Sequence, residues 1–173
     1  MYVAIISMIM MFAGLTSAYI ISSNREDWVT FDLPQGLYIS TILIILSSIS
    51  YFLAKRSIHK NNRSLTAILI ITTFCLGILF VFLQFEGFKA LIESGYRFTG
   101  EISNPKASFI FLIAFFHVLH VVAGLICILV VIYNHFKQKY NATKILGFEL
   151  AATFWHFVGI LWVFLYLLLT FVG

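Results

Sequence analysis

The sequence predicts an all-α integral membrane protein, a bundle of five transmembrane helices. Of its 173 residues, 61% are hydrophobic and only 10% are charged, whereas an ordinary soluble domain has about 25% charged residues. The chain also contains five long apolar runs that are almost free of charge, and each is close to the roughly 20 residues that cross a bilayer. These observations exclude a soluble enzyme.

Charged residues mark the expected ends of the five spans, which together form one transmembrane domain over residues 1–173. The spans cover about residues 1–23, 33–54, 64–85, 107–133 and 146–172. Between the third and fourth spans we expect a loop from Glu86 to Lys106, because Gly95 and the Asn104-Pro105 pair are typical of turns.

Basic residues are concentrated in two of the four connections between spans. The second and fourth connections contain Lys55, Arg56, Lys60, Arg63, Lys137, Lys139 and Lys144. The positive-inside rule assigns both connections to the cytoplasm, so five spans place the N-terminus inside and the C-terminus outside. The net charge of +4 therefore reflects membrane topology and indicates no nucleic-acid partner, which would require a solvated basic surface.

Two cysteines, Cys75 and Cys127, lie inside apolar runs and predict neither a disulfide framework nor a zinc site. Polar residues at membrane depth are costly and are therefore functional candidates. In the fourth span, His117, His120 and Gly124 fall on one side of a helix.

The fifth span carries a longer polar and small-residue stripe. Glu149, Ala152, His156 and Gly159 follow one another at steps of three, four and three residues, which places them on one side of the helix. Small residues in such stripes allow close helix contact, and histidines form hydrogen bonds across it. We therefore expect this side to face protein rather than lipid.

The three histidines of the fourth and fifth spans permit two interpretations. His117, His120 and His156 could hold a metal or a haem, but a metal centre needs further ligands and a bis-histidine haem needs histidines that face each other. The other interpretation is interhelical hydrogen bonding and contact with a partner subunit. We favour the second, with no catalytic, cofactor-binding or metal-binding residue on this chain.

Two other residue types in the fifth span also leave alternatives open. Glu149 has three interpretations: a proton-relay carboxylate, an ion-pair partner of a basic residue such as Lys144, or an acid that the helix dipole stabilises. Its place in the first turn favours the last two. Trp155 and Trp162 are seven residues apart and could mark one helix face, although tryptophan is also common at membrane interfaces.

The fifth span resembles the last span of subunit III of the haem-copper terminal oxidases, the cytochrome c oxidase subunit III family. The similar string runs from Gly147 to Tyr166, with Phe148-Glu149-Leu150-Ala151-Ala152 and Trp155-His156-Phe157-Val158 as its most specific parts. The segment from Phe116 to Val121, with Gly124, is similar to the family's Phe-His-Gly-x-His-Val in the preceding span.

The resemblance extends over the whole chain in order. Phe12-Ala13-Gly14-Leu15 with Tyr19, then Leu46-Ser47-Ser48, and then Gln84 before Glu86 are similar to further family motifs. Three positions depart from the family pattern. Met8 stands where many members have a glutamate, Val118 where they have glycine, and Gly159 where they have aspartate.

The resemblance implies a short, five-helix bacterial subunit III in the inner membrane. Such a subunit carries no redox cofactor and packs against the catalytic subunit I, which holds the haems and copper. Subunit II and other respiratory subunits are further partners, and phospholipid binds in the cleft between two helix groups. The implied role is support of proton uptake and enzyme lifetime, with Glu149, Trp155, His156, Gly159, His117, His120 and Gly124 as structural or interface residues. The alternative is a membrane cytochrome b or quinol-handling anchor that uses His117, His120 and His156.

Overall fold

Five long helices make up the computed structural model, which describes residues 2–24, 28, 35–95, 105–140 and 145–172. The helices are α1 (Tyr2–Ser22), α2 (Gln35–His59), α3 (Arg63–Glu93), α4 (Pro105–Phe136) and α5 (Leu146–Phe171). All five are long and apolar enough to cross a membrane, which confirms the predicted all-α fold with five transmembrane helices.

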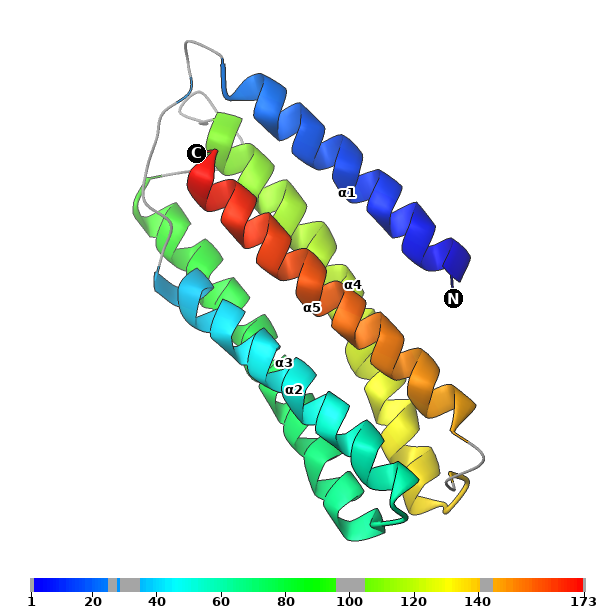
Figure 1. Cartoon of the computed structure of the whole chain (residues 1–173). Coiled ribbons are helices and arrows are strands. Elements are labelled where there is room, and N and C mark those ends of the chain that lie inside the picture. Colours follow the sequence, from blue (N-terminus) through cyan, green and yellow to red (C-terminus); the bar gives the residue numbers. More distant parts are fainter. Residues whose placement is uncertain (1, 25–27, 29–34, 96–104, 141–144, 173) are drawn as a thin grey trace.

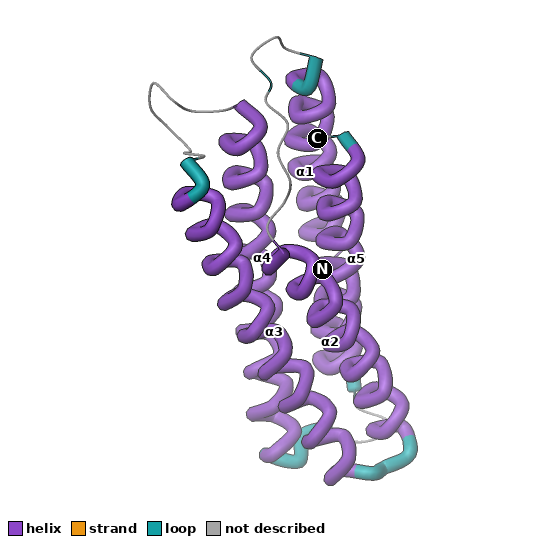
Figure 2. Tube along the Cα trace, turned by 90° about the vertical axis from the view of Figure 1, so that its left-hand side faces the viewer, coloured by secondary structure: helices purple, strands orange, loops and turns teal. Residues whose placement is uncertain are grey.

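Helices α2, α3, α4 and α5 form a closed ring in which each helix contacts the next. The helices run alternately up and down (Figure 1), and Figure 2 shows the same antiparallel order from the side. Helix α1 packs on the outside of the ring, against α4 and α5. The turns after α2 and α4 lie at one end of the bundle, and the C-terminus of α5 lies at the other.

Local side-chain chemistry fixes both ends of α3. The Asn62 side chain accepts a hydrogen bond from the Leu65 backbone N–H at 3.2 Å and caps the start of the helix. Asn61, just before it, has φ 55°, so the chain reverses sharply between α2 and α3. Gly95 follows the end of the helix with φ 89°, the left-handed conformation that glycine adopts most easily.

The prediction of a loop from Glu86 to Lys106 is wrong over its first part, because α3 continues to Glu93. Similarly, α4 begins at Pro105, so Lys106 lies in its first turn and is buried. Charged residues mark where hydrocarbon ends, but a helix continues past that point when water or headgroups solvate its side chains. Asn104 and the start of the second span expected near residue 33 lie outside the described residues.

The Trp155 indole fills the middle of the ring between α3 and α4. An ideal Cβ at Gly77 would lie 2.7 Å from Trp155 Cη2 and 2.6 Å from Leu125 Cδ2. At Gly124, on the facing helix, an ideal Cβ would lie 3.0 Å from Trp155 Cε3. The two glycines therefore leave the space that the indole occupies.

We expect Gly77→Ala to lower the stability of the full chain by about 1 to 3 kcal/mol, the usual range for an overpacked core. The indole cannot retreat easily because Gly124 and its own helix confine it on the other side. Unfolding of the purified chain in mixed micelles with increasing sodium dodecyl sulfate, followed by circular dichroism, measures the effect. Gly14→Ala is the matched control, since its ideal Cβ meets nothing within 4 Å. Equal unfolding of the two variants would contradict the role of Gly77.

Candidate functional site

The small residues of the α5 stripe lie against α2. Ala152 and Gly159 are buried, and an ideal Cβ at Gly159 would lie 3.0 Å from Ser48 Oγ and 3.6 Å from Ile44 Cγ1. Helices α2 and α5 therefore approach closely at Gly159. His156, on the same stripe, is partly buried, and its ring centroid lies 6.1 Å from that of Tyr51 on α2.

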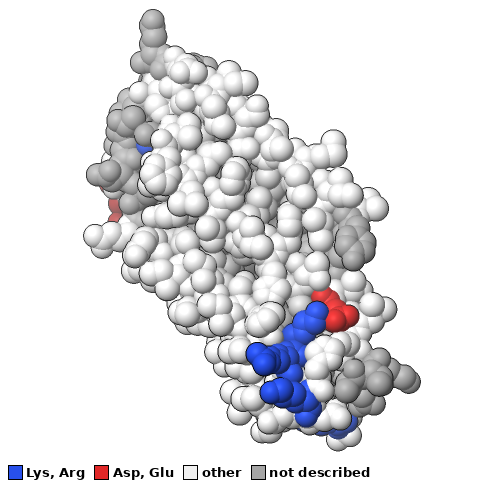
Figure 3. Space-filling view, viewed as in Figure 1, with Lys and Arg blue, Asp and Glu red and all other residues white. Residues whose placement is uncertain are grey.

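Glu149, in the first turn of α5, forms an ion pair with α2. Its Oε1 lies 2.9 Å from Lys55 Nζ, and the two side chains keep 39% and 38% of their surface exposed. Lys144, the partner suggested by the sequence, lies outside the described residues. Acidic and basic side chains adjoin at the lower end of the face in Figure 3, whose long middle part is uncharged.

The two tryptophans of α5 bind hydroxyl groups on α2. Trp155 Nε1–H donates to Ser47 Oγ at 3.1 Å, and Trp162 Nε1–H donates to Thr41 Oγ1 at 3.0 Å. All four side chains are buried. Because α2 and α5 are antiparallel, the seven-residue step between the tryptophans matches the six-residue step between the hydroxyls.

Each hydroxyl serves as donor and acceptor at once. Ser47 and Thr41 donate to the Ile44 and Leu37 carbonyls of their own helix at 2.8 Å, which leaves their lone pairs for the indoles. Ser40 Oγ likewise accepts from Gln84 Nε2 of α3 at 2.9 Å. Helix α2 is thus bonded to α5 on one side and to α3 on another.

These α2 hydroxyls are not among the site residues predicted from the sequence. Their spacing on α2 matches the spacing of the two tryptophans on α5. This match can be recognised only once the two helices are known to be antiparallel neighbours. A serine or threonine can satisfy itself on its own helix, so the sequence alone assigns it no partner.

The His117 ring is fully buried among aromatic rings. Its centroid lies 4.8 Å from the Trp162 ring, 6.0 Å from Phe80 and 6.3 Å from Phe12. Neither ring nitrogen has a hydrogen-bond partner within the described residues. His117 therefore packs as a flat aromatic surface in this structure.

The structure does not bring the three histidines together as one ligand set. His120 is partly exposed and its Nδ1 donates to the Phe116 carbonyl at 2.6 Å. His117, on α4, lies beside Trp162 of α5. Trp162 is six residues from His156, about 9 Å along the helix axis, so His117 and His156 lie at different depths in the bundle. Among the residues that the structure describes, no group of three His, Cys, Asp or Glu side chains could hold a metal ion.

Comparison with known sequences decides the family. The sequence model of the family cytochrome c oxidase subunit III matches residues 1–173. The chain belongs to this family. None of the comparisons favours a membrane cytochrome b or a quinol-handling anchor.

Several curated subunit III proteins are similar to the chain. It is 35% identical over 130 residues to cytochrome c oxidase subunit 3 of Spodoptera frugiperda, over 75% of this chain and 84% of that protein. It is 36% identical over 132 residues to cytochrome bo(3) ubiquinol oxidase subunit 3 of Buchnera aphidicola, over 75% and 66% of the two chains. The Aedes aegypti cytochrome c oxidase subunit 3 is 30% identical over 142 residues, which cover 82% of this chain and 51% of that protein. The chain thus spans about half the length of the mosquito subunit III.

We expect the indole bonds to stabilise this subunit III chain in a pairwise manner. In a double-mutant cycle of Trp155→Phe and Ser47→Ala, the coupling energy should be close to 0.6 kcal/mol and at most about 1.7 kcal/mol, the range for polar pairs in membranes. Unfolding of each variant in mixed micelles measures it. Trp155→Phe with Ser48→Ala is the control cycle, because Ser48 does not accept the indole N–H. Zero coupling in the Ser47 cycle would contradict the bond.

Proposed function

We propose that this chain is the non-catalytic subunit III of a proton-pumping haem-copper terminal oxidase in an aerobic respiratory chain of a bacterial inner membrane. The observation that carries the proposal is the match of the subunit III family over residues 1–173. In this proposal the catalytic subunit I is the main partner, and subunit II and other respiratory subunits are further partners. The haems and copper belong to those partners, and the chain supports proton uptake and the stability of subunit I.

We propose that the α2–α5 side of the basic end contacts the partner subunit. Lys55 and Glu149 form an ion pair on this side, and each keeps more than a third of its side-chain surface exposed. A partner subunit could therefore contact both side chains. His156 follows Glu149 by seven residues, about 10 Å deeper along α5. Polar groups at membrane depth are expensive in lipid and usually face protein. His156 is only partly buried within this chain, which supports a partner contact on this side.

For orientation, we propose that the N-terminus lies in the cytoplasm and the C-terminus outside. Basic side chains gather at one end of the bundle (Figure 3), the end that carries the turns after α2 and α4. The positive-inside rule assigns such an end to the cytoplasm.

As electron donor of the complex we propose cytochrome c rather than quinol. The family's name supports this choice, while the relatives include both cytochrome c and ubiquinol oxidase subunits. The neighbouring genes test it: a subunit II with a dinuclear copper motif indicates cytochrome c, and a subunit II without the motif indicates quinol.

Co-purification tests the proposed function as a whole. A tagged chain expressed in its own host should bring down a haem-copper catalytic subunit, and failure to do so would overturn the proposal. An optical spectrum of the isolated chain separates it from the cytochrome b alternative, because a haem protein shows a Soret band and a subunit without haem shows none.

Substitutions in the α5 stripe should change assembly without changing the haems. His156→Leu removes at most one polar contact, so we expect a modest loss of the chain from the complex after detergent challenge. Gly159→Leu should be worse, because overpacking against Ser48 costs about 1 to 3 kcal/mol. The measurement is subunit retention together with the haem spectrum. A bleached haem in the histidine variant would contradict a structural role of His156, and a silent glycine variant would contradict the close approach of α2 and α5 at Gly159.

A further inference from the structure

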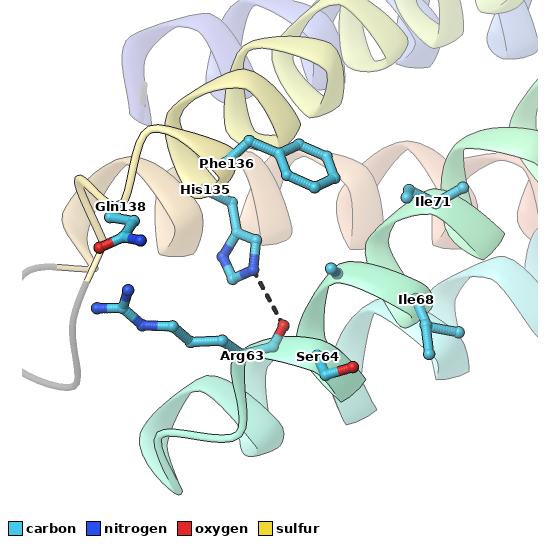
Figure 4. A pocket seen from close by; sticks show the side chains of 8 residues that line it. Arg63, Ser64, Ile68, Ile71, His135, Phe136 and Gln138 are labelled. Carbon is cyan, nitrogen blue, oxygen red and sulfur yellow. Dashed lines mark hydrogen bonds between the residues drawn. The ribbon is translucent and has the colours of Figure 1, made fainter.

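The partly buried His156 ring of α5 forms no hydrogen bond among the described residues. Two other histidines find partners inside the chain. His135 Nε2 donates to the Arg63 carbonyl at 3.1 Å (Figure 4), and His120 Nδ1 donates to the Phe116 carbonyl at 2.6 Å. An imidazole has two nitrogens, so a carbonyl of its own helix satisfies only one of them. His156 therefore keeps at least one nitrogen for a partner outside α5.

The Ser48 hydroxyl of α2 lies on the same seam, the line along which α2 and α5 meet. It is partly exposed and has no hydrogen bond within the part of the chain that the structure describes. An ideal Cβ at Gly159, three residues after His156, would lie 3.0 Å from Ser48 Oγ. Tyr51, three residues after Ser48, makes an edge-to-face ring contact with His156. Because the helices are antiparallel, Ser48 and His156 lie less than one helical turn apart along the seam.

A nearby hydroxyl on α5 has no need of a partner subunit. Thr153, between Glu149 and His156, is exposed and donates to the Glu149 carbonyl of its own helix at 2.9 Å. Such a hydroxyl is satisfied in contact with lipid. Ser48 and His156 instead keep hydrogen-bonding capacity at a depth where hydrocarbon offers no partner, and polar groups at such a depth usually face protein.

The surroundings of Ser48 and His156 fit a further helix. Phe52, one turn from Ser48 on α2, and Ile160, one turn from His156 on α5, are 58% and 70% exposed. The polar pair is thus bordered by large apolar side chains. The α5 residue at the level of Ser48 is Gly159, and small residues allow another helix to approach closely. An apolar helix with one hydrogen-bonding side chain satisfies both conditions.

We propose that a transmembrane helix of a partner subunit lies along the α2–α5 seam and presents one neutral polar side chain to His156 and Ser48. An amide or a hydroxyl fits, because each can donate and accept a hydrogen bond. A charged side chain at this depth would cost more. Lys55 and Glu149 meet the same helix nearer the basic end of the seam. This contact rests on the proposed oxidase function and adds to it the chemistry of the partner side chain.

Retention of the chain in the co-purified complex after detergent challenge tests the polar contact. His156→Phe keeps a ring against Tyr51 but removes both nitrogens. We expect the ratio of bound to free chain to fall about threefold, the usual effect of one polar contact between transmembrane helices. His156→Gln should be retained like the unaltered chain, because its amide also donates and accepts. Thr153→Val is the matched control, since the Thr153 hydroxyl is satisfied within α5.

Two further measurements separate this contact from the folding of the chain. Unfolding of the isolated His156→Phe chain in mixed micelles should match that of the unaltered chain, because the nitrogens that it loses form no bond within the described residues. A photo-reactive p-benzoylphenylalanine at Ile160 should cross-link to a transmembrane segment of a partner subunit. Mass spectrometry should then find serine, threonine, asparagine or glutamine within one turn of the attachment point. Ile78, 48% exposed on the opposite helix α3, is the control position.

The outcomes distinguish this contact from the proposed function. If the complex co-purifies but Ile160 cross-links only to lipid, or to a wholly apolar segment, the contact is overturned and the oxidase function stands. Equal retention of His156→Phe and the unaltered chain would overturn the contact in the same way, as would equal losses in His156→Phe and His156→Gln. Failure of the chain to co-purify with a haem-copper subunit would overturn the oxidase function and the contact together.

Discussion

Hydrocarbon offers no hydrogen-bond partner, so a polar group inside a membrane bundle is stabilised most by a partner within the protein. In this chain the rule fixes the register of α5 on α2 through the Trp155–Ser47 and Trp162–Thr41 bonds. A slide by one helical turn moves each indole by about 5.4 Å and separates both pairs at once. The position of the indoles in turn requires the glycines that line α3 and α4. The two indole N–H groups therefore link the register of α5 on α2 to the space that Gly77 and Gly124 leave on α3 and α4.

Helix α2 is the centre of this arrangement, with the largest buried share among the five spans. Its polar contacts to α5 begin at Thr41 and end at Lys55, about 21 Å along the helix axis. Tyr51 adds a bond to the Phe148 carbonyl at 3.3 Å. The polarity of the seam increases toward the basic end, from neutral hydroxyls to an ion pair. This gradient matches the change from hydrocarbon to headgroups.

The sequence predicted the five spans and the α5 stripe because length, apolarity and spacing are local properties. It did not predict the hydroxyl partners on α2, since each serine or threonine there has an equally good local acceptor. It also suggested Lys144 as the partner of Glu149, although Lys55 on α2 forms the pair. Which helices are neighbours depends on the packing of the whole ring, and the spacing of residues within one helix does not contain that information.

Helix α1 is attached to the ring by a different kind of contact. Thr16 donates back to the Phe12 carbonyl of α1 itself, and the Phe12 ring meets His117 and His120 of α4 edge to face at 6.3 Å and 5.8 Å. Edge-to-face contacts tolerate small axial shifts that a hydrogen bond between indole and hydroxyl does not. Within the part of the chain that the structure describes, the α4 histidines therefore meet α1 as aromatic surfaces, and these ring contacts set the axial position of α1.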